Sequence, residues 1–188
     1  MKNLLFMKLY KVNWRKFGRI IVFIDAANVI YSCKSLGWKI KYQNMQKYFK
    51  RHCRLVDIYF YFAKHAKSKK DANFLGVLAN LGFQLKVRIK KVYKNQDGSC
   101  DVKGNVDGEL IVDMISLKEQ FDTAILMSGD SDFKYVVDYL RRLGKKVIII
   151  STKYHVSKQL IDAGDIYINL KHFRGYWSFD YNPRDLAK

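Results

Sequence analysis

The chain alternates between short apolar runs and longer stretches with helical spacing. Six apolar runs predict strands, at residues 20–24, 55–62, 83–92, 123–127, 146–150 and 165–168, the last of them short. An unbroken apolar run such as 20–24 is typical of a strand covered on both faces, whereas 83–92 alternates. Helical spacing predicts helices at 43–53, 70–81, 106–119, 132–143 and 155–162. This alternation predicts an α/β protein: a Rossmann-like, three-layer α/β/α fold with a mainly parallel central sheet.

One segment interrupts the alternation. Between Lys90 and Lys103 the chain contains the turn sequence Asn-Gln-Asp-Gly at 95–98, which predicts a hairpin or excursion before the third helix. The chain holds a single proline, Pro183, and no linker rich in Ser or Gly. We therefore expect residues 1–188 to form one domain, with an aromatic-rich C-terminal tail at 171–188.

Charge is unevenly distributed along this pattern. The chain has 35 Lys and Arg against 17 Asp and Glu, a formal charge of +18. Residues 1–100 hold 22 basic and 4 acidic side chains, whereas residues 101–188 hold 13 of each. A basic surface of this size predicts a polyanionic partner, for which nucleic acid is the first candidate. Solubility alone requires far less charge.

Several other classes of protein are disfavoured. The three cysteines, Cys33, Cys53 and Cys100, form no C-x-x-C pair, which argues against a disulfide framework or a cysteine-rich zinc site. The sequence has no apolar run near the roughly 18–20 residues of a membrane span, and the first 19 residues do not read as a signal peptide. We therefore expect a cytoplasmic protein that does not contact the membrane.

Candidate chemistry follows from where the acidic residues fall. In parallel sheets, ligands bind beyond the carboxyl ends of the strands. Asp25 ends the first apolar run, Asp130 and Asp132 follow the fourth, and Asp107 begins the helix that carries Glu109. Clustered carboxylates repel one another unless a cation lies between them, and oxygen ligands select Mg²⁺ or Mn²⁺. Such a metal site beside a basic surface favours hydrolysis of phosphodiesters, in which the metal activates water.

Each acid also has a purely structural interpretation. An Asp after a strand is often only a helix N-cap, and for Asp132, which precedes Phe133, we take capping as the main role. Asp107 fits equally well as a first-turn acid that complements a helix dipole. The case for a metal site rests on the conjunction of three separate elements, each of which places acids where this fold binds ligands.

These residues together resemble a known family. Phe23-Ile24-Asp25-x-x-Asn28, Lys103-Gly104-x-Val106-Asp107 and Ser128-Gly129-Asp130-Ser131-Asp132-Phe133 occur in the order of the NYN domain, a PIN-like family of metal-dependent ribonucleases. The similarity covers about residues 19–170, so we expect a PIN-like core there. Two positions depart from the family pattern: Ala26 stands where Gly is usual, and Asn105 is inserted before Val106.

The resemblance implies roles for individual residues. Asp25, Asp107 and Asp130 would bind Mg²⁺ or Mn²⁺, Asn28 and Asp132 would orient water or metal, and Ser128 would contact the site. Because Asn105 is inserted, Glu109 is a second candidate for the position of Asp107. The activity implied is hydrolysis of single-stranded or structured RNA, with catalytic residues Asp25, Asn28, Asp107, Asp130 and Asp132.

Basic and aromatic residues flank these motifs. The lysines and arginine that we expect to hold phosphates follow the second run, alternate along the third or come soon after it: Lys64, Lys67, Lys69, Lys86, Arg88, Lys90 and Lys103. Any one of them could equally be a solvated surface charge. In the tail, Phe173, Tyr176, Trp177, Phe179 and Tyr181 either stack on unpaired bases or, as we favour, pack across the domain or into a homodimer partner.

Two further classes of function remain as alternatives. A non-catalytic RNA-binding or scaffold module would keep the fold and the basic surface, although a pure binder gains nothing from carboxylates near a polyanion. A nucleotide-binding α/β domain is disfavoured because neither G-x-x-x-x-G-K-[ST] nor G-x-G-x-x-G follows any predicted strand. A metal-dependent ribonuclease is therefore the leading hypothesis.

Overall fold

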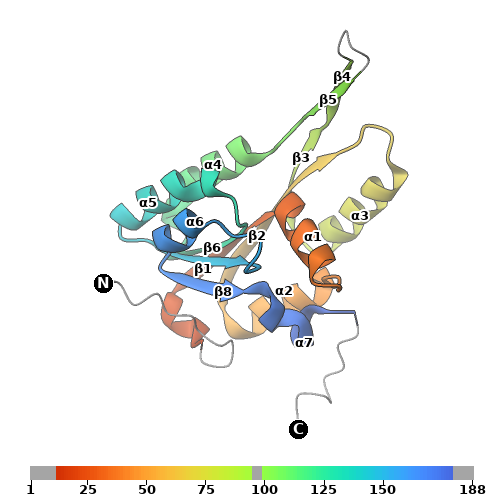
Figure 1. The fold of residues 1–188 in the computed structure, drawn as a ribbon. Coiled ribbons are helices and arrows are strands. Elements are labelled where there is room, and N and C mark those ends of the chain that lie inside the picture. Colours follow the sequence, from red (N-terminus) through yellow and green to blue (C-terminus); the bar gives the residue numbers. More distant parts are fainter. Residues whose placement is uncertain (1–11, 95–98, 180–188) are drawn as a thin grey trace.

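The computed structural model describes residues 12–94 and 99–179. A six-stranded sheet in the order β3-β2-β1-β6-β7-β8, parallel throughout, forms its centre (Figure 1). Its strands are β1 Arg19–Asp25, β2 Arg54–Lys64, β3 Gln84–Ile89, β6 Thr123–Met127, β7 Lys146–Ser151 and β8 Ile166–Asn169. Five of them lie within about two residues of the apolar runs that predicted them. The predicted run 83–92 instead covers β3 and extends into the first strand of the hairpin that follows.

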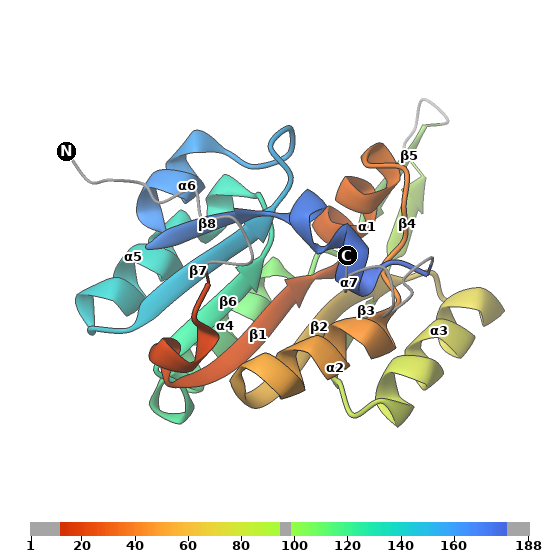
Figure 2. The ribbon, with the colours of Figure 1, turned by 90° about the horizontal axis from the view of Figure 1, so that it is seen from below.

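Helices cover both faces of the sheet (Figures 1 and 2). One face carries α1 Ala26–Ser35, α2 Tyr42–His52, α3 Lys69–Asn80 and α7 Arg174–Trp177, and the other carries α4 Asp107–Ser116, α5 Lys134–Arg142 and α6 Lys158–Ala163. Alternate residues of one strand enter the two cores: Ile20, Val22 and Ile24 pack with the first group of helices, and Ile21 and Phe23 with the second. The predicted three-layer α/β/α architecture is confirmed.

The helix α1 is absent from the prediction, which treated the chain between the first strand and residue 43 as a loop. Ala26, Val29 and Cys33 are its buried apolar positions, so its apolar stripe is only one residue wide per turn. Ile30 and Tyr31 are exposed, which blurs the helical pattern. The helix begins instead through its cap, because the Asp25 carboxylate accepts a hydrogen bond from the Asn28 amide.

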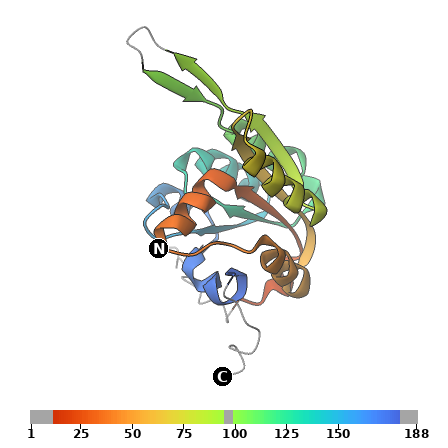
Figure 3. The same ribbon diagram turned by 90° about the vertical axis from the view of Figure 1, so that its right-hand side faces the viewer.

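A hairpin separates β3 from α4, as the sequence predicts. It consists of β4 Lys91–Lys94 and β5 Cys100–Lys103, paired antiparallel, and it projects from the body of the domain (Figures 1 and 3). The predicted turn at 95–98 lies outside the described residues. At the base of the hairpin, Gly104 has a φ of +145° and a Cβ there would lie 3.0 Å from the Lys90 Cα, so the two arms approach closely only with glycine.

The described part of the C-terminal segment packs onto the core. Phe173 and Trp177 are fully buried, stacked on each other with ring centroids 3.8 Å apart, and both rings contact Tyr48 of α2. These two rings are therefore unavailable for stacking on bases. Phe179 is 63% exposed, and Tyr181 lies outside the described residues.

The strand order places one special point in the sheet. From β1 the chain moves outward through β2 to β3, then returns to β6 on the other side of β1 and continues through β7 to β8. The direction of winding therefore reverses between β1 and β6. In open α/β sheets, the crevice at the carboxyl ends of such a strand pair is the usual ligand site.

Candidate active site

Asp25 lies at the point where the winding reverses. It is the last residue of β1, and the residue as a whole is only 7% exposed to solvent. Its Oδ1 accepts a hydrogen bond from the Asn28 amide at 3.2 Å, and its Oδ2 accepts one from the Ser128 hydroxyl at 2.8 Å. One oxygen therefore starts helix α1 while the other ties β1 to the end of β6.

Ser128 connects Asp25 to the second acidic segment. It is fully buried directly after β6, and its Oγ also accepts a hydrogen bond from the Asp130 amide at 3.2 Å. Asp130 in turn caps the 3-10 helix Ser131–Phe133 by accepting from the Asp132 amide at 3.0 Å. The prediction that Asp132 is the N-cap is therefore wrong: the cap lies two residues earlier because a short 3-10 turn precedes α5. Asp132 itself is exposed.

Gly129 allows a neighbouring loop to close over this segment. A Cβ at this position would overlap the carbonyl group of His155, which is backbone and has no room to move. The Gly129 carbonyl accepts a hydrogen bond from the Ser157 amide at 2.8 Å, which holds the loop after β7 in place. Glycine is therefore required here for close backbone approach.

Asn28 contacts a third strand end. It is half-buried in the first turn of α1, and its Oδ1 accepts from the Ser151 hydroxyl at 3.5 Å, where β7 ends. The carboxyl ends of β1, β6 and β7 thus meet through Asp25, Asn28 and Ser128. Parallel pairing explains this meeting, because it aligns the three ends along one edge of the sheet.

Asp107 approaches the same edge from α4. It is the first residue of that helix, half-buried, and its Oδ2 accepts a hydrogen bond from the Asn105 side-chain amide at 2.8 Å. Burial first, and then the negative charges of Asp25, Asp130 and Asp132, raise the pKa of the Asp107 carboxyl. The hydrogen bond from Asn105 therefore holds Asp107 in a position where the negative charges of the other three acids act on its carboxylate.

Glu109, the second candidate for this position, lies elsewhere. Its carboxylate pairs with the Arg88 guanidinium at 2.5 Å, and one turn later Asp113 pairs with Lys86 at 3.3 Å. These two ion pairs join α4 to the edge strand β3. Glu109 therefore has a cationic partner of its own, whereas Asp107 has none among the residues that the structure describes.

The acids at this edge carry uncompensated charge. Burial is the main cause that raises the pKa of Asp25, the hydrogen bonds from Ser128 and Asn28 oppose it, and the charge of Asp130 raises it further. Among the described residues, none forms an ion pair with Asp25, Asp107, Asp130 or Asp132. A cation from outside the chain would relieve this repulsion.

The donor set fits a hard divalent ion. Carboxylate, hydroxyl and amide oxygens are the ligands that Mg²⁺ and Mn²⁺ prefer. Within residues 12–94 and 99–179, no group of three or more His, Cys, Asp or Glu side chains is gathered closely enough to hold a metal ion by itself. This agrees with Mg²⁺ chemistry, since that ion is commonly held by one or two carboxylates and keeps several waters.

The predicted phosphate-binding residues fall into two groups. Lys64 ends β2 three residues beyond Tyr61, the register partner of Asp25, and exposed Lys67 and Lys69 follow it. These three lie at the carboxyl edge of the sheet. Lys86 and Arg88 point instead to α4 and are ion-paired there.

Two predicted basic residues sit at the hairpin. Lys90 is half-buried at its base, where its amide donates to the Lys64 carbonyl at 2.9 Å. Lys103 ends β5, and its side chain lies outside the described part of the chain. The hairpin base therefore adjoins the carboxyl end of β2.

Sequence reasoning did not single out one aromatic pair near the acids. Tyr31, 61% exposed on α1, meets the His155 ring edge to face at a centroid distance of 4.6 Å. The His155 Nε2 lies 2.9 Å from the Ser35 hydroxyl. The sequence offers little signal for these contacts, because His155 lies 120 positions after Ser35. What it does show is that Tyr31 and His155 each follow the end of a strand.

Comparison with known proteins adds to this geometry. The family model described as the NYN domain matches residues 19–171. The chain belongs to the NYN domain family. The family that the sequence motifs resemble is thereby confirmed. Members of this family are regarded as possible nucleases. In the described part of this NYN chain, no helix is long and apolar enough to cross a membrane.

Two relatives extend over most of the NYN chain. The low amplitude and bright protein LabA of Synechococcus elongatus is 28% identical over 164 residues, which cover 85% of this chain and 87% of LabA. The crystal structure of a protein of unknown function from Vibrio parahaemolyticus matches with a TM-score of 0.67 and 27% identity, covering 81% of this chain and 93% of that one.

Proposed function

We propose that this NYN domain is a metal-dependent ribonuclease that hydrolyses RNA phosphodiester bonds at the carboxyl edge of its sheet. The observation that carries the proposal is the set of four carboxylates, from β1, α4 and the β6–α5 connection, that have no cationic partner among the described residues. Carboxylates without partners are costly in a folded protein unless an ion or a substrate uses them. Family membership supports the same chemistry.

In this proposal each residue at the carboxyl edge has its own role, which follows from its position. Of Asp25, Asp107 and Asp130, one or two carboxylates would bind Mg²⁺ or Mn²⁺ directly and the others through its waters. The bound ion would supply an activated water and neutralise charge on the phosphate. Ser128 keeps the Asp25 carboxylate oriented by its 2.8 Å hydrogen bond, and Asn28 anchors the first turn of α1. Asp132, exposed beside Asp130, accepts a hydrogen bond from the attacking water.

The lysines provide binding rather than chemistry. Lys64, Lys67 and Lys69 lie at the same edge of the sheet as Asp25, so they hold phosphates on either side of the bond that is cleaved. Contacts to phosphates carry no sequence information and weaken with salt. Lys86 and Arg88 contribute by positioning α4, and with it Asp107.

One observation favours a second candidate, a non-catalytic RNA-binding module. Over the described ranges, the acids do not form a closed group of three ligands. Such a module would bind RNA through its lysines with no cleavage, and metal would not change its stability.

The deciding experiment measures both properties. Purified protein is incubated with end-labelled RNA in Mn²⁺, Mg²⁺ or EDTA, alongside Asp25→Asn/Asp130→Asn and the matched control Asp122→Asn, an acid at the opposite edge of the sheet. We expect the wild type to cleave RNA and EDTA to abolish this cleavage. The double variant should cleave about 10³-fold more slowly or worse, whereas the Asp122→Asn control should cleave at the wild-type rate. Equal activity in the wild type and the double variant would overturn the assignment. RNA binding without cleavage in either metal would establish the second candidate instead.

A further inference from the structure

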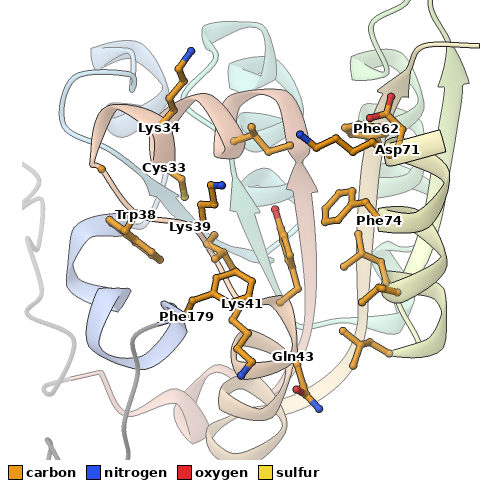
Figure 4. Close-up of a pocket in the computed structure, with 18 residues that line it drawn as sticks. Cys33, Lys34, Trp38, Lys39, Lys41, Gln43, Phe62, Asp71, Phe74 and Phe179 are labelled. Atoms are coloured by element: carbon orange, nitrogen blue, oxygen red, sulfur yellow. The ribbon is translucent and has the colours of Figure 1, made fainter. Parts of the chain in front are cut away.

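A large apolar groove lies beside the acidic edge and has no role in the function proposed above. It has a volume of about 840 Å³ and opens between α1, the segment that leads into α2, and α3 (Figure 4). Trp38 and Phe179 line it from one side, and Phe62 and Phe74 from the other. Its walls therefore combine aliphatic side chains with aromatic rings from separate parts of the chain.

Backbone pairing holds one wall of the groove in place. Ile40 and Ser178 form an antiparallel bridge, and the Lys41 amide donates to the Trp177 carbonyl at 2.6 Å. This pairing presents Phe179, 63% exposed, to the groove. The exposed ring is thus carried by a fixed backbone and needs no rearrangement to meet a ligand.

The opposite wall is equally well supported. Phe74 of α3 contacts Phe62 and Tyr42 with ring centroids 6.1 and 5.6 Å away. Phe62 and Phe74 are half-buried, so part of each ring faces the groove. Val77, 58% exposed, extends this apolar wall along α3.

Four lysines surround these apolar walls: Lys34, Lys39, Lys41 and Lys70. None of them forms an ion pair with another described residue. The one acid in the lining, Asp71, accepts a hydrogen bond from the His65 amide at 3.2 Å. The groove therefore combines apolar rings with several free positive charges.

The groove and the acidic edge are joined by helix α1. Helix α1 begins at its cap Asp25 and reaches the groove at Ile30, Cys33 and Lys34, on the order of 10 Å further along its axis. On the neighbouring strand, Phe62 directly follows Tyr61, the register partner of Asp25. A polymer that leaves the acids along α1 therefore enters the groove.

We infer that this groove binds the unpaired bases of a single-stranded RNA whose scissile phosphate lies at the acidic edge. Aromatic rings offer stacking surfaces for bases of any sequence, and lysines along the rim meet the phosphates. The number of free lysines distinguishes this ligand from an amphiphilic monoanion such as a fatty acid, which would satisfy only one of them. The inference rests on the proposed function for the position of the cleaved bond, but binding can be tested separately.

The first experiment measures binding without cleavage. A fluorescent oligouridine is titrated in EDTA with the Asp25→Asn/Asp130→Asn chain, with or without the groove substitutions Lys34→Ala/Lys39→Ala/Lys70→Ala. The matched control removes three exposed lysines outside the groove, Lys47→Ala/Lys50→Ala/Lys146→Ala. We expect the groove variant to lose about tenfold or more in affinity, and its slope of log K against log salt to fall by about 2. Equal losses in the two variants would overturn the inference.

A second variant separates stacking from charge. Phe179→Ala removes an exposed ring and leaves the buried core intact. We expect it to weaken oligouridine binding by about fivefold or more with an unchanged salt slope, because a stacking contact releases no counterions. Unchanged affinity in Phe179→Ala would contradict a base in this groove. Saturable binding of dodecanoate that oligouridine does not displace would identify the groove as a monoanion site and would also overturn the inference.

Cleavage assays then distinguish failure of this inference from failure of the proposed function. If wild-type protein cleaves RNA and the groove variant does so with unchanged KM, the groove inference fails while the function stands. If the groove variant loses oligouridine binding but wild-type protein never cleaves RNA, the groove inference stands and the proposed reaction fails.

Discussion

Acidic residues occupy both edges of the central sheet, and the two sets differ in their partners. At the amino edge, Asp122 forms an ion pair with Arg19 at 2.9 Å, and Asp165 forms one with Arg141 at 3.0 Å. Both also accept hydrogen bonds from strand amides, those of Arg19 and Val147. These acids are part of the scaffold, because each has its counter-charge within the chain.

At the carboxyl edge, Asp25, Asp107, Asp130 and Asp132 have no such partner in the part of the chain that the structure describes. The Arg19 guanidinium lowers the pKa of Asp122 to about 2, whereas burial and neighbouring carboxylates raise the pKa of both Asp25 and Asp107. An acid that stabilises a fold has its counter-charge within the chain, whereas an acid that binds a ligand obtains its counter-charge from that ligand. The pKa direction thus differs between the acids paired within the sheet and the acids to which we assign the proposed function.

The largest expected effect comes from the glycines that shape the two edges. Gly129→Ala would press a Cβ into the His155 backbone, and we expect it to destabilise the fold by about 3 kcal/mol. At the amino edge, a Cβ at Gly18 meets the Asp122 side chain and requires a φ of +66°, so Gly18→Ala should cost less. Chemical denaturation measures both values.

The control for these two substitutions is Gly76→Ala in the middle of α3, where a Cβ meets no atom within 4 Å. It should stabilise the protein by up to about 1 kcal/mol, because alanine is the better helix former. A smaller loss for Gly129→Ala than for Gly18→Ala would show that the carboxyl edge is the more adaptable of the two.

The second effect is stabilisation by metal. At Mn²⁺ concentrations of about 100 times its Kd, binding adds about 2.7 kcal/mol, which corresponds to a rise in Tm of about 5–10 °C for a chain of this length. Differential scanning calorimetry should show this rise in the wild type and in Asp122→Asn, and not in Asp25→Asn/Asp130→Asn. A rise of the same size in the double variant would place the metal away from the carboxyl edge.

The third effect concerns the paired acid. Asp122→Asn removes the ion pair to Arg19, and because the pair is half exposed and screened by solvent, we expect a fall in Tm of only about 2–4 °C at pH 7. The pKa of Asp122 is lowered from 3.8 to about 2, so its stabilisation is complete above pH 3.8 and is lost as the pH falls towards 2. Melting curves across this range should show the wild type and the variant converging at low pH.

The smallest effect has the opposite sign. Asp107→Asn removes an unpaired charge and keeps the hydrogen bond from Asn105, so without metal we expect the Tm to rise by about 1–2 °C at pH 7. Because the pKa of Asp107 is raised, its charged form opposes folding once the pH exceeds that pKa, and the gain should vanish below pH 3.8. Thermal melts of metal-free protein at both pH values test this. A lower Tm at pH 7 would mean that Asp107 is a structural acid.

Much of the fold was predictable because strands buried on both faces leave a plain signal. The run 20–24 has no polar residue, and only a strand in the middle of a layered sheet tolerates that on both sides. Helix α1 was missed because its stripe of Ala26, Val29 and Cys33 is narrow and is masked by the exposed Ile30 and Tyr31. Its start is fixed by Asp25, whose carboxylate accepts a hydrogen bond from the Asn28 amide, which is the capping role that an Asp directly after a strand often has.

The candidate site was predictable in its strand-end acids but not in their partners. That Glu109 pairs with Arg88, while Asp107 faces the other acids, depends on the angle at which α4 leaves the hairpin. Lys86 and Arg88 were expected to face phosphates, and only the packing of α4 against β3 shows that they serve acids of the same chain. Local spacing carries no information about contacts of this kind.

The sequence by itself determined the layered α/β architecture, the family and the acids at the strand ends, because burial periodicity and motif order are local properties of the chain. Tertiary structure alone decided which carboxylates are paired and which are free, and it alone assembled the aromatic groove from Trp38, Phe62, Phe74 and Phe179. These four residues come from separate elements. Long-range packing brings them together, and it also sets the electrostatic balance that separates scaffold from site.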